Sequence, residues 1–390
     1  MNMKTEPGSA AEQAGPRTRM LVIATLGFAV TFWAWALISP LAPSLATKLG
    51  LSSFQQSLIV AVPVIVGSLG RIPIGALTDR FGGRLMLPIV SVATIVPVLF
   101  LAFFGDQSLA TLLIGGFFLG IGGTSFAVGV PFVSAWFPPE RRGLAIGIFG
   151  VGMVGTAISA FTTVRLVEFG SSATPFLVTA AALAIYAVVA WLLLRDAPGQ
   201  VRPTTSMAKR VGETLKLGVT WQAAALYATL FGGYVAFSVY LPSLLKAEYD
   251  LSIGDASNRM AGFVILAVIM RPVGGFLSDK IGPVPVLATC LGAVVFGALI
   301  DATSPALFPI ATIAYLVMAA GLGAGSGATF ALVALLSPAG KVGSVTGVVG
   351  AAGGLGGFVP PLLMGVVYGA TGSYTIGFLL LALVAAAVLV

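Results

Sequence analysis

The sequence contains no histidine, and Cys290 is the only cysteine among its 390 residues. The absence of histidine excludes the usual forms of a catalytic zinc site and of an imidazole proton shuttle. A single cysteine cannot form a disulfide within one chain. The remaining residues show no nucleophile next to a base and no cluster of metal ligands. We therefore expect no enzyme, no metal site and no cofactor.

Charged side chains and asparagine are also scarce. Only 8% of the residues are charged, and Asn2 and Asn258 are the two asparagines. Hydrophobic residues make up 58% of the chain, and its mean hydropathy is +1.05. A typical soluble domain has about 25% charged residues. This composition excludes a soluble globular protein and indicates a membrane protein.

Apolar runs long enough to cross a bilayer recur along the whole chain. A membrane-spanning helix needs about 20 apolar residues, whereas a β-barrel would show short alternating segments. We therefore predict an all-α integral membrane protein with twelve transmembrane helices. The predicted spans are residues 20–43, 54–77, 85–104, 109–133, 143–164, 173–194, 219–245, 256–277, 284–300, 306–336, 341–369 and 373–390.

Lysine and arginine are distributed unevenly between the two sides of the predicted bundle. The apolar run after the polar N-terminus is too long for a signal peptide, so we expect an uncleaved first helix. Fourteen basic residues then fall on the side of the N-terminus and four on the other side. Because basic loops stay in the cytoplasm, we expect a multi-pass protein of the cell (inner) membrane with both termini cytoplasmic. The same bias explains the net charge of +7 without nucleic-acid binding.

Two regions of the chain repeat at an offset of 200 residues without a gap. The offset aligns Arg71, Gly75, Leu77, Asp79 and Gly82 with Arg271, Gly275, Leu277, Asp279 and Gly282, and also Pro138, Gly143, Gly147 and Gly150 with Pro338, Gly343, Gly347 and Gly350. We therefore predict a cytoplasmic tail at 1–19, a six-helix half at 20–194, a cytoplasmic linker at 195–218 and a second six-helix half at 219–390. Equivalent helices run in the same direction, so the halves are related by an axis along the membrane normal and could rock about a central site.

The repeat places one arginine inside the membrane in each half. Arg71 and Arg271 each lie eight residues before the aspartate of the repeated loop, roughly 12 Å along a helix and near the middle of a bilayer about 30 Å thick. A charged arginine there costs about 2.5–3.5 kcal/mol. Snorkelling does not suit this depth, and no aspartate or glutamate lies inside a predicted helix to form an ion pair. We therefore expect the two arginines to bind an anion from outside the protein.

The loops of the repeat resemble a known signature. "GALTDRFGGR" at 75–84 resembles the cytoplasmic loop of the major facilitator superfamily, and "GFLSDKIG" at 275–282 resembles its second copy. In that superfamily, which the chain resembles over nearly its whole length, the loop acts as a conformational latch between the halves. The resemblance assigns this role to Gly75, Asp79 and Arg80 in the first copy and to Gly275, Asp279 and Lys280 in the second. We expect these residues to affect turnover without contacting substrate.

Three stretches narrow the resemblance to the nitrate/nitrite porter family. "GFFLGIGGTSFAVGVPFVSAWFPPERRGLAIGIFGVGMVGTA" at 116–157 is similar to its nitrate signature, and "GSVTGVVGAAGGLGGFVPPLLMG" at 343–365 to the second copy of that signature. "LFGGYVAFSVYLPSLLK" at 230–246 is similar to the seventh helix of the family. The likeness implies that a small anionic substrate is approached closely by the backbone at Gly150, Gly152, Gly353 and Gly354. Close helix packing in lipid is the alternative role for each glycine.

The same resemblance suggests which side chains surround the substrate. Aromatic site residues of the family correspond here to Phe126, Tyr227, Phe231 and Phe330, although aromatic rings also fill helix interiors routinely. A guanidinium is planar and presents paired donors that match the edge of nitrate, nitrite or a carboxylate. We therefore expect nitrate or nitrite as substrate, with a small monocarboxylate as the alternative.

One position departs from the porter signature. The family commonly has an asparagine where this chain has Met153, so the amide that would donate to the anion is absent. Its candidate replacements are Thr156, Ser125 and Thr329. This departure leaves the choice between nitrate and nitrite open.

Two other functions fit a membrane protein of this composition. A proton-coupled exporter of apolar compounds is disfavoured by two buried cations without acids. A membrane anion receptor would need a soluble output domain, and no long segment lies outside the predicted helices. Because no aspartate, glutamate or histidine is predicted in the membrane interior to carry a proton, we expect anion exchange. We expect the protein to act as a monomer in the lipid bilayer.

Overall fold

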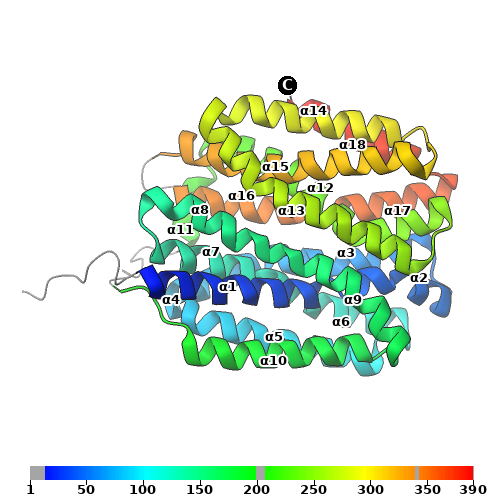
Figure 1. Ribbon diagram of the computed structural model, residues 1–390, viewed down its shortest axis with the longest axis horizontal. Coiled ribbons are helices and arrows are strands. Elements are labelled where there is room, and N and C mark those ends of the chain that lie inside the picture. Colours follow the sequence, from blue (N-terminus) through cyan, green and yellow to red (C-terminus); the bar gives the residue numbers. More distant parts are fainter. Residues whose placement is uncertain (1–13, 199–206, 339–341, 390) are drawn as a thin grey trace, which may run out of the picture.

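The structure is a computed structural model that describes residues 14–198, 207–338 and 342–389. These residues form a bundle of helices that run along the long axis of the molecule (Figure 1), and the described part contains no strand. Eleven helical segments of this part are long and apolar enough to cross a membrane, and the shorter apolar helix α18 accompanies them. The predicted all-α membrane fold is therefore confirmed.

The first half of the chain supplies six of these segments, four of which are built from more than one helix. They are α1 (Ala14–Trp35) with α2 (Ile38–Leu49), α3 (Ser53–Leu69) with α4 (Arg71–Phe81), α5 (Gly83–Phe104), α6 (Leu109–Leu119) with η1 (Gly120–Thr124) and α7 (Ser125–Trp136), α8 (Pro139–Gly150) with η2 (Val151–Val154) and α9 (Gly155–Phe169), and α10 (Thr174–Leu193).

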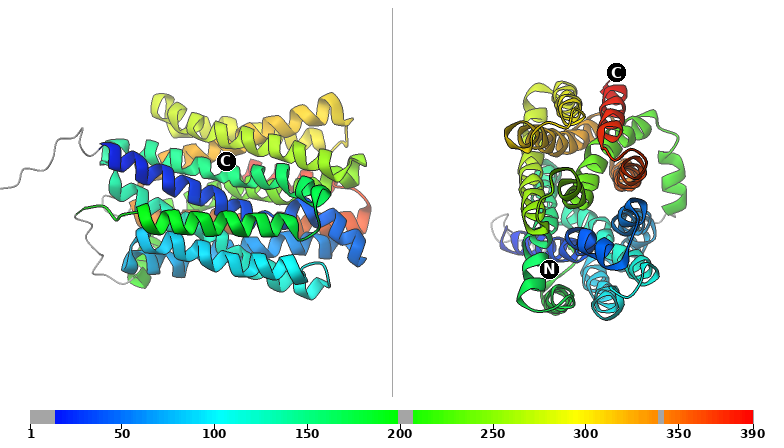
Figure 2. Two further views of the ribbon diagram at one scale, coloured as in Figure 1. Left: turned by 60° about the horizontal axis from the view of Figure 1, so that its bottom comes forward. Right: turned by 90° about the vertical axis from the view of Figure 1, so that its right-hand side faces the viewer.

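The second half follows after the short helix α11 (Met207–Thr214). It contains α12 (Gly218–Tyr249), α13 (Ile253–Ile281), α14 (Pro283–Asp301), η3 (Leu307–Ala311) with α15 (Thr312–Leu336), α16 (Val342–Gly356) with α17 (Val359–Thr371), and α18 (Thr375–Leu389). The end-on view in Figure 2 shows the helices of the two halves as two groups side by side. We call the side on which α1 begins the terminus side, and the other the opposite side.

Serine residues begin three helices at the opposite side. The hydroxyls of Ser52, Ser108 and Ser252 each accept a hydrogen bond from the backbone N–H three residues later, at the starts of α3, α6 and α13. Such caps satisfy N–H groups that have no partner within the helix, so the turn between two spans can be short.

Two spans contain breaks that the apolar pattern did not predict. The segments η1 and η2 are tight 3₁₀ turns in the glycine-rich stretches of the fourth and fifth spans. A Cβ added at Gly122 would meet the carbonyl of Thr31, and one added at Gly155 would meet the carbonyl of Ala29. Both spans therefore approach the backbone of α1 at a distance that only glycine permits.

The two halves meet mainly toward the opposite side. There α9 packs on α13, α17 packs on α3, and α2 packs on α12. Arg165 of α9 donates to Asn258 Oδ1 of α13 at 3.1 Å, and the Ser39 hydroxyl donates to the carbonyl of Val239. Toward the terminus side, α4 packs mainly on α3, α5 and α7 of its own half. The described conformation is thus closed at the opposite side and looser toward the terminus side.

One expectation from the sequence is wrong, because an acidic residue does lie buried at the end of a span. The predicted span stopped at residue 300, whereas α14 continues to Asp301. The Asp301 side chain is only 3% exposed, and neither carboxylate oxygen has a hydrogen-bond partner among the described residues. The predicted span ends one residue too early because hydropathy counts Asp301 as a charged residue. It does not show that neighbouring helices bury this side chain.

Glycines bring α13 and α15 into backbone contact. A Cβ at Gly274 of α13 would meet the carbonyl of Ala324, and a Cβ at Gly327 of α15 would meet the carbonyl of Arg271. Small residues allow such close approach in lipid, where no hydrophobic effect drives helices together. These contacts hold the backbone of Arg271 against α15.

The close contact at Gly274 generates a prediction on stability. We expect Gly274→Ala to destabilise the protein by about 1–3 kcal/mol, because the added methyl must push α15 away. The measurement is the melting temperature of the purified protein in detergent. Gly262→Ala on the same helix is the matched control, because a Cβ there meets no atom within 4 Å. Equal melting temperatures for the two variants would contradict this account of the packing.

Candidate functional site

Arg71 is the first residue of α4 and lies buried, with 8% of its surface exposed. Its Nε lies 3.4 Å from the carbonyl oxygen of Gly123 in the same half. Its Nη1 donates to the carbonyl of Gly350 on α16, at 2.8 Å. The guanidinium of the first half is therefore bound to the backbone of the second half.

Arg271 lies within α13 and makes the reciprocal connection. Its Nη2 donates to the Tyr227 hydroxyl of α12 at 2.7 Å, and its Nη1 contacts the Met153 sulfur of η2, also at 2.7 Å. A Cβ added at Gly150 would lie 3.9 Å from the Arg271 Nε. Gly150 and Gly350 are equivalent in the repeat, so the two arginines face equivalent positions of the opposite halves, and Arg71 donates to the carbonyl there.

Aromatic rings lie against both guanidinium groups. The Phe231 ring centre is 6.0 Å from Arg71 Cζ and 5.4 Å from Arg271 Cζ, so one ring is shared by the two cations. Phe126 lies 5.2 Å from Arg71 Cζ, and Tyr227 lies 5.8 Å from Arg271 Cζ. Ring faces attract cations, and such contacts are stronger where water is excluded. These rings help to hold two like charges close together.

The fourth predicted ring, Phe330, lies one layer behind. It packs edge-on against Tyr227 with the ring centres 4.8 Å apart, and Tyr227 in turn stacks on Phe231 at 4.7 Å. The structure therefore brings all four predicted aromatic residues together with both arginines.

No described acidic side chain pairs with either arginine. The described ion pairs join Lys48 to Asp106 and Arg259 to Asp255, and all four of these side chains are partly exposed. The partners of the central arginines are instead carbonyl oxygens, a phenol and a thioether, which are all neutral. Two positive charges are thus held within the bundle without a compensating charge from the described protein.

Three of the four predicted glycines lie at this cluster. A Cβ added at Gly354 would lie 3.3 Å from Arg71 Nη1, and one added at Gly353 would meet the rings of Tyr227 and Phe231. Gly150 faces Arg271 across open space. Gly152 is different, because its Cα faces the Phe28 ring and the carbonyl of Thr25 on α1.

The hydroxyls expected to replace the missing amide all have partners in the chain. Thr156 contacts the Met153 carbonyl and the Tyr234 hydroxyl, Ser125 contacts the Thr31 hydroxyl, and Thr329 donates to the carbonyl of Gly325. The polar partners of Arg71 are backbone carbonyls, which the sequence does not reveal because every residue has one, whereas those of Arg271 are the Tyr227 hydroxyl and the Met153 sulfur. The sequence also did not predict the contact of Arg271 with Met153, because it marks Met153 only as a departure from the porter signature.

The predicted latch residues lie at the terminus side, around two similar turns. Gly82 and Gly282 end α4 and α13 with φ of +84° and +86°, a conformation that favours glycine. Arg80 and Lys280 are exposed and lie over the rings of Phe81 and Phe276.

The remaining latch residues lie near the surface where the structure describes them. Asp279 is exposed, and Gly75 and Gly275 are partly exposed. The Asp79 side chain lies outside the part that the structure describes. Asp196, which sequence analysis missed, accepts a hydrogen bond from the Arg84 backbone N–H at the start of α5, at 2.9 Å.

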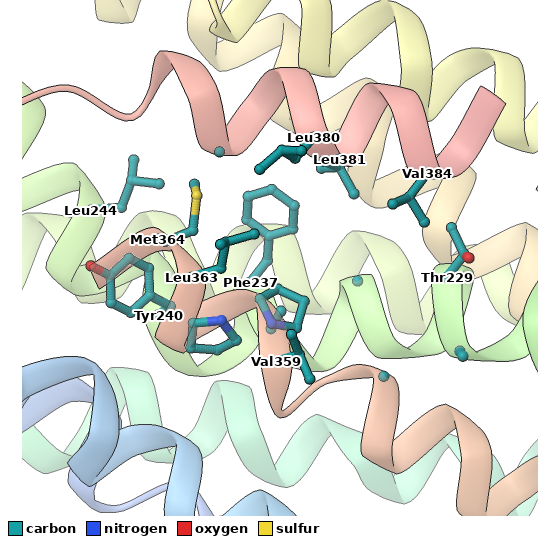
Figure 3. Close-up of a pocket in the computed structure, with 17 residues that line it drawn as sticks. Thr229, Phe237, Tyr240, Leu244, Val359, Leu363, Met364, Leu380, Leu381 and Val384 are labelled. Carbon is teal, nitrogen blue, oxygen red and sulfur yellow. The ribbon is translucent and has the colours of Figure 1, made fainter. Parts of the chain in front are cut away.

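A larger pocket lies on the other side of α12, between α12, α17 and α18 (Figure 3). It has a volume of about 300 Å³, and its polar side chains are Thr229 and Tyr240. The Thr229 hydroxyl donates to the carbonyl of Ala225, and the Tyr240 hydroxyl contacts the Tyr374 hydroxyl. This apolar pocket offers no charge to an anion, so the arginine cluster is the candidate functional site.

Two six-helix halves that meet at a buried Arg71 and a partly buried Arg271 define a multi-pass membrane transporter and not an enzyme. The sequence profile of the Major Facilitator Superfamily matches residues 24–257 and 223–390. A solved structure of a bacterial homologue of the human lysosomal transporter Spinster, in an inward-facing and unoccupied conformation, superimposes with a TM-score of 0.72. It shares 19% identity, and the match covers 92% of this chain and 83% of that one.

Individual relatives are considerably more similar in sequence. The probable nitrate/nitrite transporter NarK2 of Mycobacterium tuberculosis (strain H37Rv) is 49% identical over 93% of this chain and 92% of its own length. The nitrite extrusion protein of Bacillus subtilis (strain 168) is 36% identical over 94% and 91%. The probable nitrate transporter NarT of Staphylococcus haemolyticus is 35% identical over 93% of each chain. The chain therefore belongs to the major facilitator superfamily and, within it, to the nitrate/nitrite porters.

Proposed function

We propose that this protein exchanges nitrate and nitrite across the cell membrane and that Arg71 and Arg271 clamp the anion between the two halves. The observation that carries the proposal is the pair of central guanidiniums, Arg71 buried and Arg271 partly buried, whose described partners are all neutral. The names of the relatives support the same class of anion. The basic residues on the terminus side support a cytoplasmic location of that side.

Binding of an anion would replace neutral partners of Arg71 and Arg271 with a charged one. The free volume beside Arg71 is about 10 Å³, room for about one water molecule. A bound anion must therefore replace present contacts, such as those of Arg71 with Gly350 and of Arg271 with Met153. An anion adds charge–charge attraction to these hydrogen bonds, which a neutral carbonyl, hydroxyl or thioether does not supply. A planar ion also fits between stacked rings and presents its edges to both guanidiniums.

The same contacts suggest how binding is linked to alternating access. Each arginine is held by the half opposite to its own, so an anion between them draws the halves together and offsets the repulsion of the two cations. Without an anion the two cations repel each other, and this repulsion opposes the change of conformation. The protein therefore changes conformation more readily with an anion bound, in either direction. This preference is the physical basis of exchange.

The described residues at the arginine cluster include no side chain suited to couple proton transfer to transport. No described carboxyl contacts either arginine, and arginine does not release its proton in proteins. The one described buried carboxyl, Asp301, lies at the end of α14 on the opposite side. The substrate site therefore supports exchange of one anion for another.

Exchange is tested by uptake of labelled nitrate into proteoliposomes. We expect uptake when nitrate or nitrite is inside, because the returning site needs an anion, and little uptake into vesicles without one. Formate and acetate inside serve as monocarboxylate controls and should support little exchange. Accumulation of nitrate driven only by an imposed pH gradient would overturn the proposed exchange.

The two-arginine clamp predicts the effect of conservative substitutions. Arg71→Lys and Arg271→Lys keep a charge but lose the planar pair of donors. We expect each variant to lose at least tenfold in nitrate and nitrite exchange, corresponding to one lost charge-assisted bond of about 1.5–3 kcal/mol. Arg259→Lys, at a partly exposed ion pair on the opposite side, is the matched control and should retain exchange. Normal exchange by both central lysine variants would exclude bidentate recognition.

The contact of Arg271 with Met153 predicts a change in selectivity. Met153→Asn supplies an amide N–H donor beside the anion, and nitrate has one more oxygen than nitrite to accept it. One added hydrogen bond of about 0.5–1.5 kcal/mol would raise affinity roughly two- to tenfold. We expect the half-saturating concentration to fall more for nitrate than for nitrite in competition assays. Met153→Leu is the control for volume, and an equal shift in that variant would contradict the role of the amide.

A further inference from the structure

A buried carboxyl that the transport proposal does not use lies near the opposite side. Asp301 ends α14, is 3% exposed, and has no hydrogen-bond partner for either oxygen among the described residues. Two tyrosine hydroxyls, Tyr249 at the end of α12 and Tyr315 on α15, interact with it electrostatically.

The charged groups around Asp301 do not neutralise a carboxylate. On α12, Glu248 acts on both tyrosines and carries the same sign of charge. On α13, Asp255 and Arg259 form a partly exposed pair with each other. The described residues of α18 include no charged side chain, and Tyr374 precedes this helix.

An isolated carboxylate is costly to bury in such surroundings. Transfer of an ionised carboxyl into an apolar environment without a partner costs far more than transfer of the neutral acid, which can also donate a hydrogen bond. The nearby tyrosine hydroxyls are suitable acceptors for an acid proton. The surroundings of Asp301 therefore fit the protonated carboxyl.

We propose that Asp301 is a proton-binding site, separate from the anion site and accessible from the opposite side. In the described conformation the carboxyl holds a proton. When this end of the bundle opens, the O–H bond of the acid breaks and the proton passes to water on the opposite side. On closure the carboxylate takes a proton back from that water. No other reactant is required, and the assignment does not rest on the identity of the transported anion.

Helix α12 connects this site to the contact between the halves. Its residue Tyr249 lies beside Asp301, while Val239 of the same helix accepts a hydrogen bond from Ser39 of α2 in the first half. Helix α12 also packs on α3 of the first half. Separation of the halves at this end removes these supports of α12 and exposes Asp301 to water. Binding of the proton thus stabilises the conformation closed at the opposite side.

Infrared spectroscopy of the purified protein tests the site directly. We expect the wild type at neutral pH to show the C=O band of a protonated carboxyl, and Asp301→Asn to lack it. Asp255→Asn, which removes a partly exposed acid near the same end of the bundle, is the matched control and should keep the band. Absence of the band in the wild type, or its persistence in Asp301→Asn, would overturn the proposal.

Transport measurements test the consequence for the cycle. With nitrate on both sides, we expect wild-type exchange to slow severalfold as the pH on the opposite side is lowered, because the proton favours the closed end. Exchange by Asp301→Asn should not respond to that pH, since its amide does not titrate, whereas Asp255→Asn should respond like the wild type. A wild-type response in Asp301→Asn would overturn the link to transport. If nitrate is not a substrate, the exchange signal is absent altogether while the infrared result still decides the proton site.

Discussion

Two positive charges held in the middle of an apolar bundle are the constraint on which this structure depends. Arg71 is buried and Arg271 partly buried, neither has a described acidic partner, and both lie over the same aromatic ring. Their donors are satisfied by neutral acceptors, and each arginine uses a partner from the other half. The interface between the halves is therefore also the place where the charge is least compensated, which is a suitable place to bind a small anion.

Close backbone contact is the means by which the bundle holds these charges in position. Gly327 lets α15 touch the Arg271 backbone, and Gly354 lets α16 approach Arg71. Gly122 and Gly155 allow two spans of the first half to lie against α1. Side chains larger than glycine would separate the helices at each place and move the guanidiniums apart. The high glycine content thus serves both packing and the geometry of the site.

The two halves are similar at the site but differ in the acid at their outer end. Arg71 meets Gly350 and Arg271 faces Gly150, as expected for two copies of one repeat. Asp301 has no acidic counterpart in the first half, where residue 101 is Leu101. One half therefore carries a group that can respond to protons, while the anion site between the halves does not need one.

The sequence by itself determined the class of fold, the repeat and the two arginines inside the membrane, because a single chain displays its composition, its apolar runs and its internal repeat directly. The aromatic residues around the arginines came from the resemblance to the porter family. Only the tertiary structure decided which neutral atoms bind the arginines, that Gly152 faces α1, and that Asp301 is buried without a partner. Carbonyl oxygens belong to every residue type, and burial depends on helices far apart in the chain. Such features follow from how the helices pack, and no local pattern contains that information.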